Sequence, residues 1–223
     1  MTKIAVIAGT AFDTHLGAEV LQKKGFKAVE IPLSRNPKEQ SIMQQLDKAH
    51  ITDYVLEKLK PVQDHIGAVF IYCNSLSAAL NLPLLQQKLP LPAITPLNAY
   101  KAYAKQYQNL LIWAANAQSA AGIEKIMVAE NAGLNMLSLS FLPLVEAIEK
   151  QQNFAETQRQ LQLKSLLASF AQIQIEGLGF DALILGCTHF PYIKQELQEI
   201  SPLKILDPID DMLSQLARLM AFD

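Results

Sequence analysis

Eight short apolar runs, separated by longer amphipathic stretches, most constrain the fold of this chain. The runs are residues 3–8, 28–32, 68–72, 92–95, 110–113, 136–139, 182–185 and 203–206. Strand-like runs that alternate with helical stretches are typical of a parallel α/β sheet. The runs are nearly all apolar, instead of alternating polar and apolar, which indicates strands covered by helices on both faces. The sequence therefore predicts an α/β fold with parallel strands.

A repeated segment predicts that this fold consists of two similar halves. Residues 68–75 read AVFIYCNS and residues 182–189 read ALILGCTH, so each is an apolar run that ends in cysteine and a small polar residue. The two copies lie about half a chain length apart in 223 residues. We expect two parallel-sheet α/β lobes related by a pseudo-twofold axis, with the active site in the cleft between them. The expected lobes are residues 1–95 completed by 207–223, and residues 96–206.

Composition restricts the partners of the chain. The 19 Lys and Arg nearly balance the 21 Asp and Glu, and no basic run is present, which argues against nucleic acid. The first apolar run is too short for a signal peptide and no run is long enough to cross a membrane, so we expect a cytoplasmic protein. A small molecule is the expected partner, and a homodimer is left open. In the cytoplasm Cys73 and Cys187 are expected to be free thiols.

Two cysteines in equivalent positions are suited to one kind of chemistry. Parallel sheets bind ligands beyond the carboxyl ends of their strands, where Cys73 and Cys187 are expected to lie. Racemisation removes a proton from one face of a carbon and returns a proton to the other face. A thiol and a thiolate on opposite faces can do this without a cofactor or a metal. The alternatives are two buried structural cysteines or a redox pair.

The residues around both cysteines resemble a known superfamily. Residues 73–75, Cys-Asn-Ser, and residues 185–191, Leu-Gly-Cys-Thr-His-Phe-Pro, are similar to the aspartate/glutamate racemases, and the second motif looks most like glutamate racemase. His189 stands where similar aspartate racemases usually carry Glu. The resemblance implies a cofactor-independent racemase of an acidic amino acid, glutamate first. For glutamate it also implies the supply of D-glutamate for cell-wall peptidoglycan.

The resemblance also implies which residues assist the two cysteines. Asp13, in a segment similar to the Asp-Ser pair of glutamate racemases, would assist Cys73; the alternative is that Asp13 caps a helix. His189 would assist Cys187. Glu146 resembles the family acid that supports this histidine, and it could fix the imidazole tautomer; the alternative is a solvated glutamate.

A second group of polar residues is expected to bind the substrate. Backbone and side-chain donors of Asn74, Ser75 and Thr188 would hold the α-carboxylate, where charge develops during proton removal. Thr14 takes the place of the serine in the Asp-Ser pair. Asn116 retains polarity where the family often shows threonine.

One departure from the family pattern leaves the substrate open. Residues 32–34 read Pro-Leu-Ser, where glutamate racemases typically read Pro-Tyr-Gly and help to hold the substrate. The alternatives within the superfamily are an aspartate racemase or an isomerase of the hydantoin, malonate or maleate type. The alternative from another class is a non-catalytic α/β module that binds a small acidic ligand or responds to oxidation.

Overall fold

The structure is a computed structural model of the chain, and it describes residues 3–35, 39, 43, 46–173 and 179–221. The chain divides into two compact units, Met1–Leu97 with Asp210–Asp223, and Asn98–Ile209. Within the described residues, no helix combines the length and the apolar character needed to span a bilayer.

The first unit contains a four-stranded parallel sheet in the order β2-β1-β3-β4. Its elements are β1 (Lys3–Ala8), α1 (Ala11–Lys23), β2 (Lys27–Pro32), α3 (Lys48–Leu59), a 3₁₀ turn η1 (Gln63–His65), β3 (Ile66–Ile71), α4 (Asn74–Ala79), α5 (Leu82–Lys88) and β4 (Ala93–Ile94). The C-terminal helix α12 (Pro208–Met220) completes this unit from Asp210 onward.

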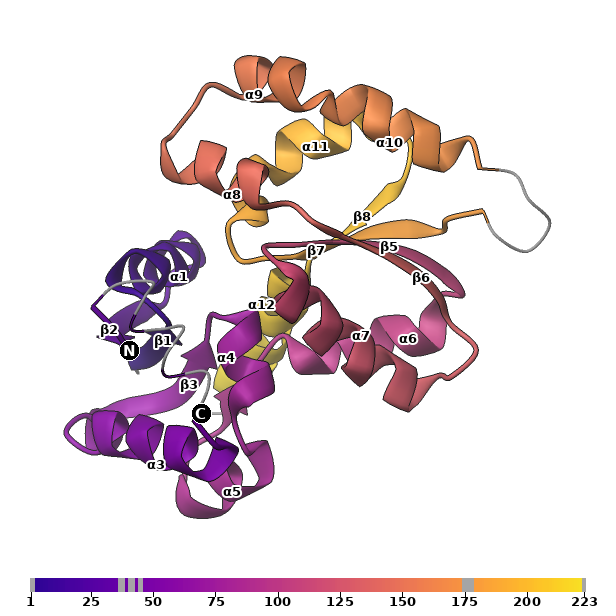
Figure 1. Cartoon of the computed structure of the whole chain (residues 1–223). Helices are drawn as coiled ribbons and strands as arrows, with labels where there is room; N and C mark the ends of the chain where they lie inside the picture. Colours follow the sequence, from indigo (N-terminus) through magenta and orange to yellow (C-terminus); the bar gives the residue numbers. More distant parts are fainter. Residues whose placement is uncertain (1–2, 36–38, 40–42, 44–45, 174–178, 222–223) are drawn as a thin grey trace. The chain divides into compact units, whose positions relative to one another are not determined.

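The second unit repeats this topology, with a parallel sheet in the order β6-β5-β7-β8. Its elements are α6 (Leu97–Gln106), β5 (Asn109–Ala114), α7 (Ala117–Glu130), β6 (Asn135–Ser140), α8 (Leu142–Glu149), α9 (Phe154–Leu161), α10 (Leu163–Ala171), β7 (Ala182–Gly186), a 3₁₀ turn η2 (Phe190–Ile193), α11 (Lys194–Ile200) and β8 (Lys204–Leu206). In Figure 1, α8 to α11 cover one face of this sheet and α6 and α7 lie on the other. The predicted α/β class with two similar parallel sheets is confirmed.

The strand order explains where each unit can bind a ligand. In each sheet the first strand lies between the second and the third, so the connections after the first and third strands leave in opposite directions. A crevice for ligands forms at such a switch point, beyond the carboxyl ends of those two strands. In the first unit these are β1 and β3, and in the second unit β5 and β7. Both cysteines follow the third strand of their sheet.

Glycine permits close packing beside each switch point. A Cβ atom added to Gly17, on α1, would lie 2.7 Å from Cγ of Tyr72 and 2.8 Å from Cγ1 of Val6. A Cβ atom added to Gly186 would lie 2.8 Å from the backbone oxygen of Trp113. These contacts are shorter than van der Waals contacts, so α1 lies close to its sheet, and the end of β7 lies close to β5, only because both residues are glycine.

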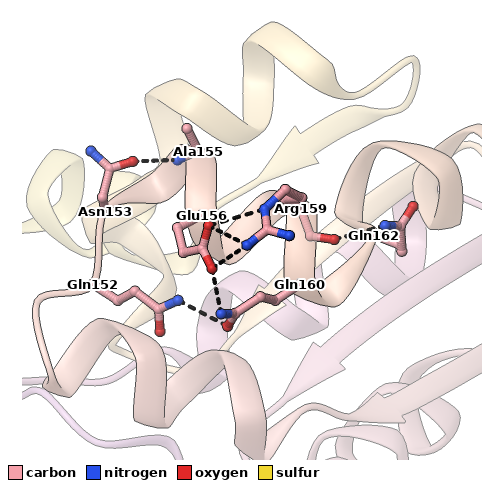
Figure 2. Close-up of polar contacts among 7 residues, drawn as sticks. All are labelled: Gln152, Asn153, Ala155, Glu156, Arg159, Gln160 and Gln162. Atoms are coloured by element: carbon pink, nitrogen blue, oxygen red, sulfur yellow. Dashed lines mark hydrogen bonds and ion pairs between the residues drawn. The ribbon is translucent and has the colours of Figure 1, made fainter.

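Helix α9 carries several local polar contacts at the surface. Oδ1 of Asn153 accepts a hydrogen bond of 2.9 Å from the backbone N–H of Ala155, and Nε of Arg159 donates to Oε2 of Glu156 at 3.0 Å (Figure 2). Arg159 also holds the pKa of Glu156 below its usual value. Exposed pairs of this kind contribute little stability, and α9 therefore depends on its N-cap and on the neighbouring helices α8 and α10.

Replacing Gly17 by alanine should destabilise the protein by about 1–3 kcal/mol, because the added methyl group must displace the buried Tyr72 and Val6. Urea unfolding followed by circular dichroism measures this loss. Gly133→Ala is the matched control, since its Cβ atom would lie 3.4 Å from Oδ1 of Asn131, at ordinary contact distance. Equal stability of the two variants would contradict the close approach of α1 to the sheet.

Candidate active site

In the first unit, polar groups surround the side chain of Cys73. It follows β3, and as the N-cap residue of α4 it has extended backbone geometry. The residue is buried, and its Sγ lies 3.4 Å from Oγ of Ser75. Burial raises the pKa of the Cys73 thiol, and the charge of Asp13 raises it further. Ser75 and backbone hydrogen bonds at Leu76 and Gly9 lower it by less. The net effect favours the protonated thiol.

Asp13 lies in the first turn of α1, close enough for its charge to act on Cys73. It is not the N-cap of this helix. Thr10 is the N-cap: its Oγ1 accepts from the backbone N–H of Asp13 at 3.2 Å and donates to Oδ2 of Asp13 at 2.9 Å. The helix start therefore holds the carboxylate in place. The spacing Thr-x-x-Asp resembles a capping box and is the sequence signal that would have identified Thr10.

Cys187 has an imidazole as its neighbour. It directly follows β7, and its Sγ lies 3.4 Å from Nδ1 of the buried His189. Trp113 and Phe190 pack in the same hydrophobic cluster as Cys187. The thiol thus has apolar neighbours on one side, and the imidazole of His189 can exchange a proton with it.

The carboxylate beside His189 belongs to Glu149 and not to Glu146. Oε1 of Glu149 lies 3.2 Å from Nε2 of His189, within ion-pair distance when the imidazole is protonated. Glu146 instead lies 3.4 Å from Nζ of Lys150, on the surface. Both glutamates are on α8, three residues apart, and so neighbour one another on the helix surface. The sequence analysis expected this carboxylate at Glu146, one helical turn earlier on the same helix face.

The predicted substrate-binding residues are distributed over both units. Asn74 and Ser75 begin α4 immediately after Cys73, and Thr188 lies buried between Cys187 and His189. Thr14 is fully buried, and its hydroxyl donates to the backbone oxygen of Thr10 at 2.6 Å. This hydrogen bond stabilises the start of α1.

Asn116 is the N-cap of α7, where its Oδ1 accepts from the backbone N–H of Ser119 at 2.9 Å. The pair repeats the contact between Thr10 and Asp13 at the equivalent helix of the first unit. Asn116 thus has a structural contact that the sequence interpretation did not foresee. Within the described residues, no group of three or more His, Cys, Asp or Glu side chains could hold a metal ion.

Comparison with known proteins gives consistent results. A model of the Asp/Glu/Hydantoin racemase family matches residues 7–216. A glutamate racemase of Limosilactobacillus reuteri is 30% identical over 164 residues, which cover 71% of this chain and 59% of that protein. The chain thus spans about three fifths of the length of this relative.

Solved structures with the same fold cover nearly the whole chain. Glutamate racemase from Francisella tularensis, in complex with D-glutamate, has a TM-score of 0.69 and 21% identity over 98% of this chain and 80% of that one. An aspartate racemase homologue from Pyrococcus horikoshii has a TM-score of 0.70 and 13% identity over 99% and 100%. With the family match over most of its length, the chain belongs to the Asp/Glu/Hydantoin racemase family.

Proposed function

We propose that this protein racemises an acidic amino acid, glutamate first, without a cofactor, and that Cys73 and Cys187 are its two acid–base groups. One observation carries the proposal: each of two matching sheets has a buried cysteine after its third strand, with a proton-exchanging side chain near it. The glutamate racemases among the relatives support glutamate as the first substrate to test.

In the proposed reaction the two thiols exchange roles. One cysteine, as thiolate, takes the α-proton and becomes a thiol, and the electron pair of the broken C–H bond passes into a carbanion conjugated with the α-carboxylate. The other cysteine, as thiol, gives its proton to the opposite face of the same carbon and becomes a thiolate. Donors from Asn74, Ser75 and Thr188 would stabilise the charge on the carboxylate. The proposal requires both cysteines to reach one α-carbon.

Each thiol has its own assisting group. Asp13 can accept the proton of the Cys73 thiol, which is needed because that thiol has a raised pKa. His189 can take up or return the proton of Cys187 through Nδ1, while Glu149 stabilises the protonated ring from the side of Nε2. Glu149 is a positioning residue, since it acts through the histidine. With glutamate as substrate, the product D-glutamate would serve cell-wall synthesis in the cytoplasm.

The function is tested with purified protein, L- or D-glutamate and a chelator, without pyridoxal phosphate, followed by circular dichroism of the amino acid. We expect either enantiomer to reach the racemic mixture. Aspartate is the second substrate to test. Loss of activity on chelation would contradict the cofactor-free mechanism, and no conversion of either amino acid would contradict the assigned substrate class.

Replacing either cysteine by alanine should nearly abolish inversion, because one face of the substrate loses its acid–base group. The remaining thiolate should still exchange the α-proton of one enantiomer for deuterium in D₂O, with retention of configuration. Proton NMR of each enantiomer measures this exchange. Cys73→Ala and Cys187→Ala should exchange opposite enantiomers; by family resemblance Cys73 serves the D form and Cys187 the L form. Exchange of the same enantiomer by both variants would refute the two-thiol mechanism. Exchange of neither enantiomer would also refute it, and this is the result that a redox pair would give.

Replacing Asp13 by Asn should separate thiol ionisation from turnover. The pKa of Cys73 should fall toward its ordinary value, because the substitution removes a negative charge that raises it. The rate at which iodoacetamide alkylates Cys73 can be measured across pH in a Cys187→Ala background. This rate should reach half of its maximum at a lower pH when Asp13 is replaced. Racemisation by Asp13→Asn alone should nevertheless slow by on the order of 100-fold, since the proton acceptor is lost. An unchanged alkylation profile would show that the carboxylate does not act on the thiol.

Glu149→Gln should lower kcat by about 10- to 100-fold with a smaller change in KM, because the carboxylate supports His189 and does not hold substrate. Glu146→Gln is the matched control, on the same helix and with a similarly half-exposed side chain, 52% against 49%. It should retain the parental rate. Steady-state kinetics of both variants, and recovery of activity in Glu149→Asp, measure the difference. Equal losses in the two glutamine variants would contradict the assignment.

A further inference from the structure

Strand β6 is an outer strand of the second sheet, and among the described strands it pairs with β5 alone. The backbone N–H of Asn135 donates to the oxygen of Gln108 at 2.9 Å, and that of Phe141 donates to the oxygen of Ala114 at 2.8 Å. Because backbone groups point alternately to the two sides of a strand, the odd-numbered residues of β6 face β5. The N–H and C=O groups of Met136, Ser138 and Ser140 therefore face away from the sheet. No described residue bonds to them.

The β6 edge lacks the features that keep other edges from pairing. Its six residues, Asn-Met-Leu-Ser-Leu-Ser, carry no charge and no proline. Proteins usually protect exposed edges with charged side chains, above all lysine, or with very short strands. The other outer strands follow this rule: β2 carries Lys27 and Glu30, β8 carries Lys204, and β4 has two residues. Leu137 on β6 is also 38% exposed.

We propose that β6 pairs antiparallel with β6 of a second copy of this chain, about a twofold axis at Ser138, perpendicular to the sheet. In this register Ser138 faces Ser138 of the second copy, and Met136 faces its Ser140. Each of these is a hydrogen-bonded pair, in which two opposed residues exchange both N–H···O bonds. All the outward donors and acceptors of Met136, Ser138 and Ser140 are thus satisfied at once. The two sheets join into one continuous sheet.

The side chains of β6 also match a second β6 in this register. Leu137 faces Leu139 of the second copy in a non-hydrogen-bonded pair, where side chains approach most closely. Because β6 is uncharged, pairing it with itself brings no like charges together, as would happen with Lys27 or Lys204. The pattern favours self-association over a charged foreign strand.

The first experiment measures the mass of the protein in solution by light scattering after size exclusion. At micromolar concentration the parent should have twice the mass of the 24.7 kDa chain. Leu137→Lys should have the mass of one chain. At matched concentrations its thermal transition should lie below that of the parent only by the stability that association adds to the dimer. Val128→Lys is the control, because Val128 is exposed to a similar degree, 45%, on α7. It should remain a dimer.

The second experiment tests the register by disulfide formation. In Ser138→Cys the two new cysteines face one another, with Cα atoms about 5.5 Å apart, which suits a disulfide. In Ser140→Cys the two cysteines are roughly 14 Å apart and cannot join. Mild oxidation should therefore give a reducible dimer band in Ser138→Cys, and none in Ser140→Cys or in the parent, whose Cys73 and Cys187 are buried.

Three outcomes would overturn the proposal, and none depends on racemase activity. If the parent has the mass of one chain, β6 does not pair with a second copy, and the edge is open to a strand of another protein. A dimer that survives in Leu137→Lys is formed by another surface. Equal crosslinking of the two cysteine variants contradicts the twofold axis at Ser138.

Discussion

The position of the candidate catalytic groups depends on the parallel pairing of β1 with β3 and of β5 with β7. Parallel strands end at the same edge of a sheet, and here the connections that follow them leave in opposite directions. Asp13 and Cys73 are 60 positions apart in sequence, yet Asp13 lies in the first turn of the helix that follows β1, and Cys73 follows the neighbouring strand β3. The close approach at Gly17 and Gly186 preserves this geometry, because a larger residue would separate α1 from its sheet or β7 from β5.

The surroundings of the two cysteines are alike in backbone and unlike in charge. Cys73 has an acid in its surroundings, which raises its pKa and favours the neutral thiol. Cys187 has an imidazole backed by a carboxylate, and a protonated imidazole would favour the thiolate. A two-base racemase needs one thiol and one thiolate in its resting state. In the proposed mechanism the unequal neighbours supply this difference within an otherwise repeated topology.

The sequence was sufficient to predict the features that follow from local patterns. Apolar runs predicted parallel strands, and the repeated strand-Cys segment predicted two similar lobes, each with a cysteine at the end of a buried strand. Side-chain contacts across elements could not be predicted in this way. Glu146 and Glu149 share one helix face, and only the packing of α8 against the turn after β7 selects Glu149. Thr14 and Asn116 looked like ligand donors, since polar residues at helix starts can bind substrate or cap the helix.

The path of the chain between the two units has a consequence for synthesis. The second unit is one continuous segment, Asn98–Ile209, whereas the first unit is interrupted by it and completed only by Asp210–Asp223. As the ribosome releases the chain from its N-terminus, the second unit has all its residues before the first one does. The nascent first unit therefore lacks α12 until the second unit has been synthesised. Met212 and Leu216 of α12 are buried in the finished protein. Until then the apolar surface that α12 covers is exposed, which favours aggregation of the nascent chain.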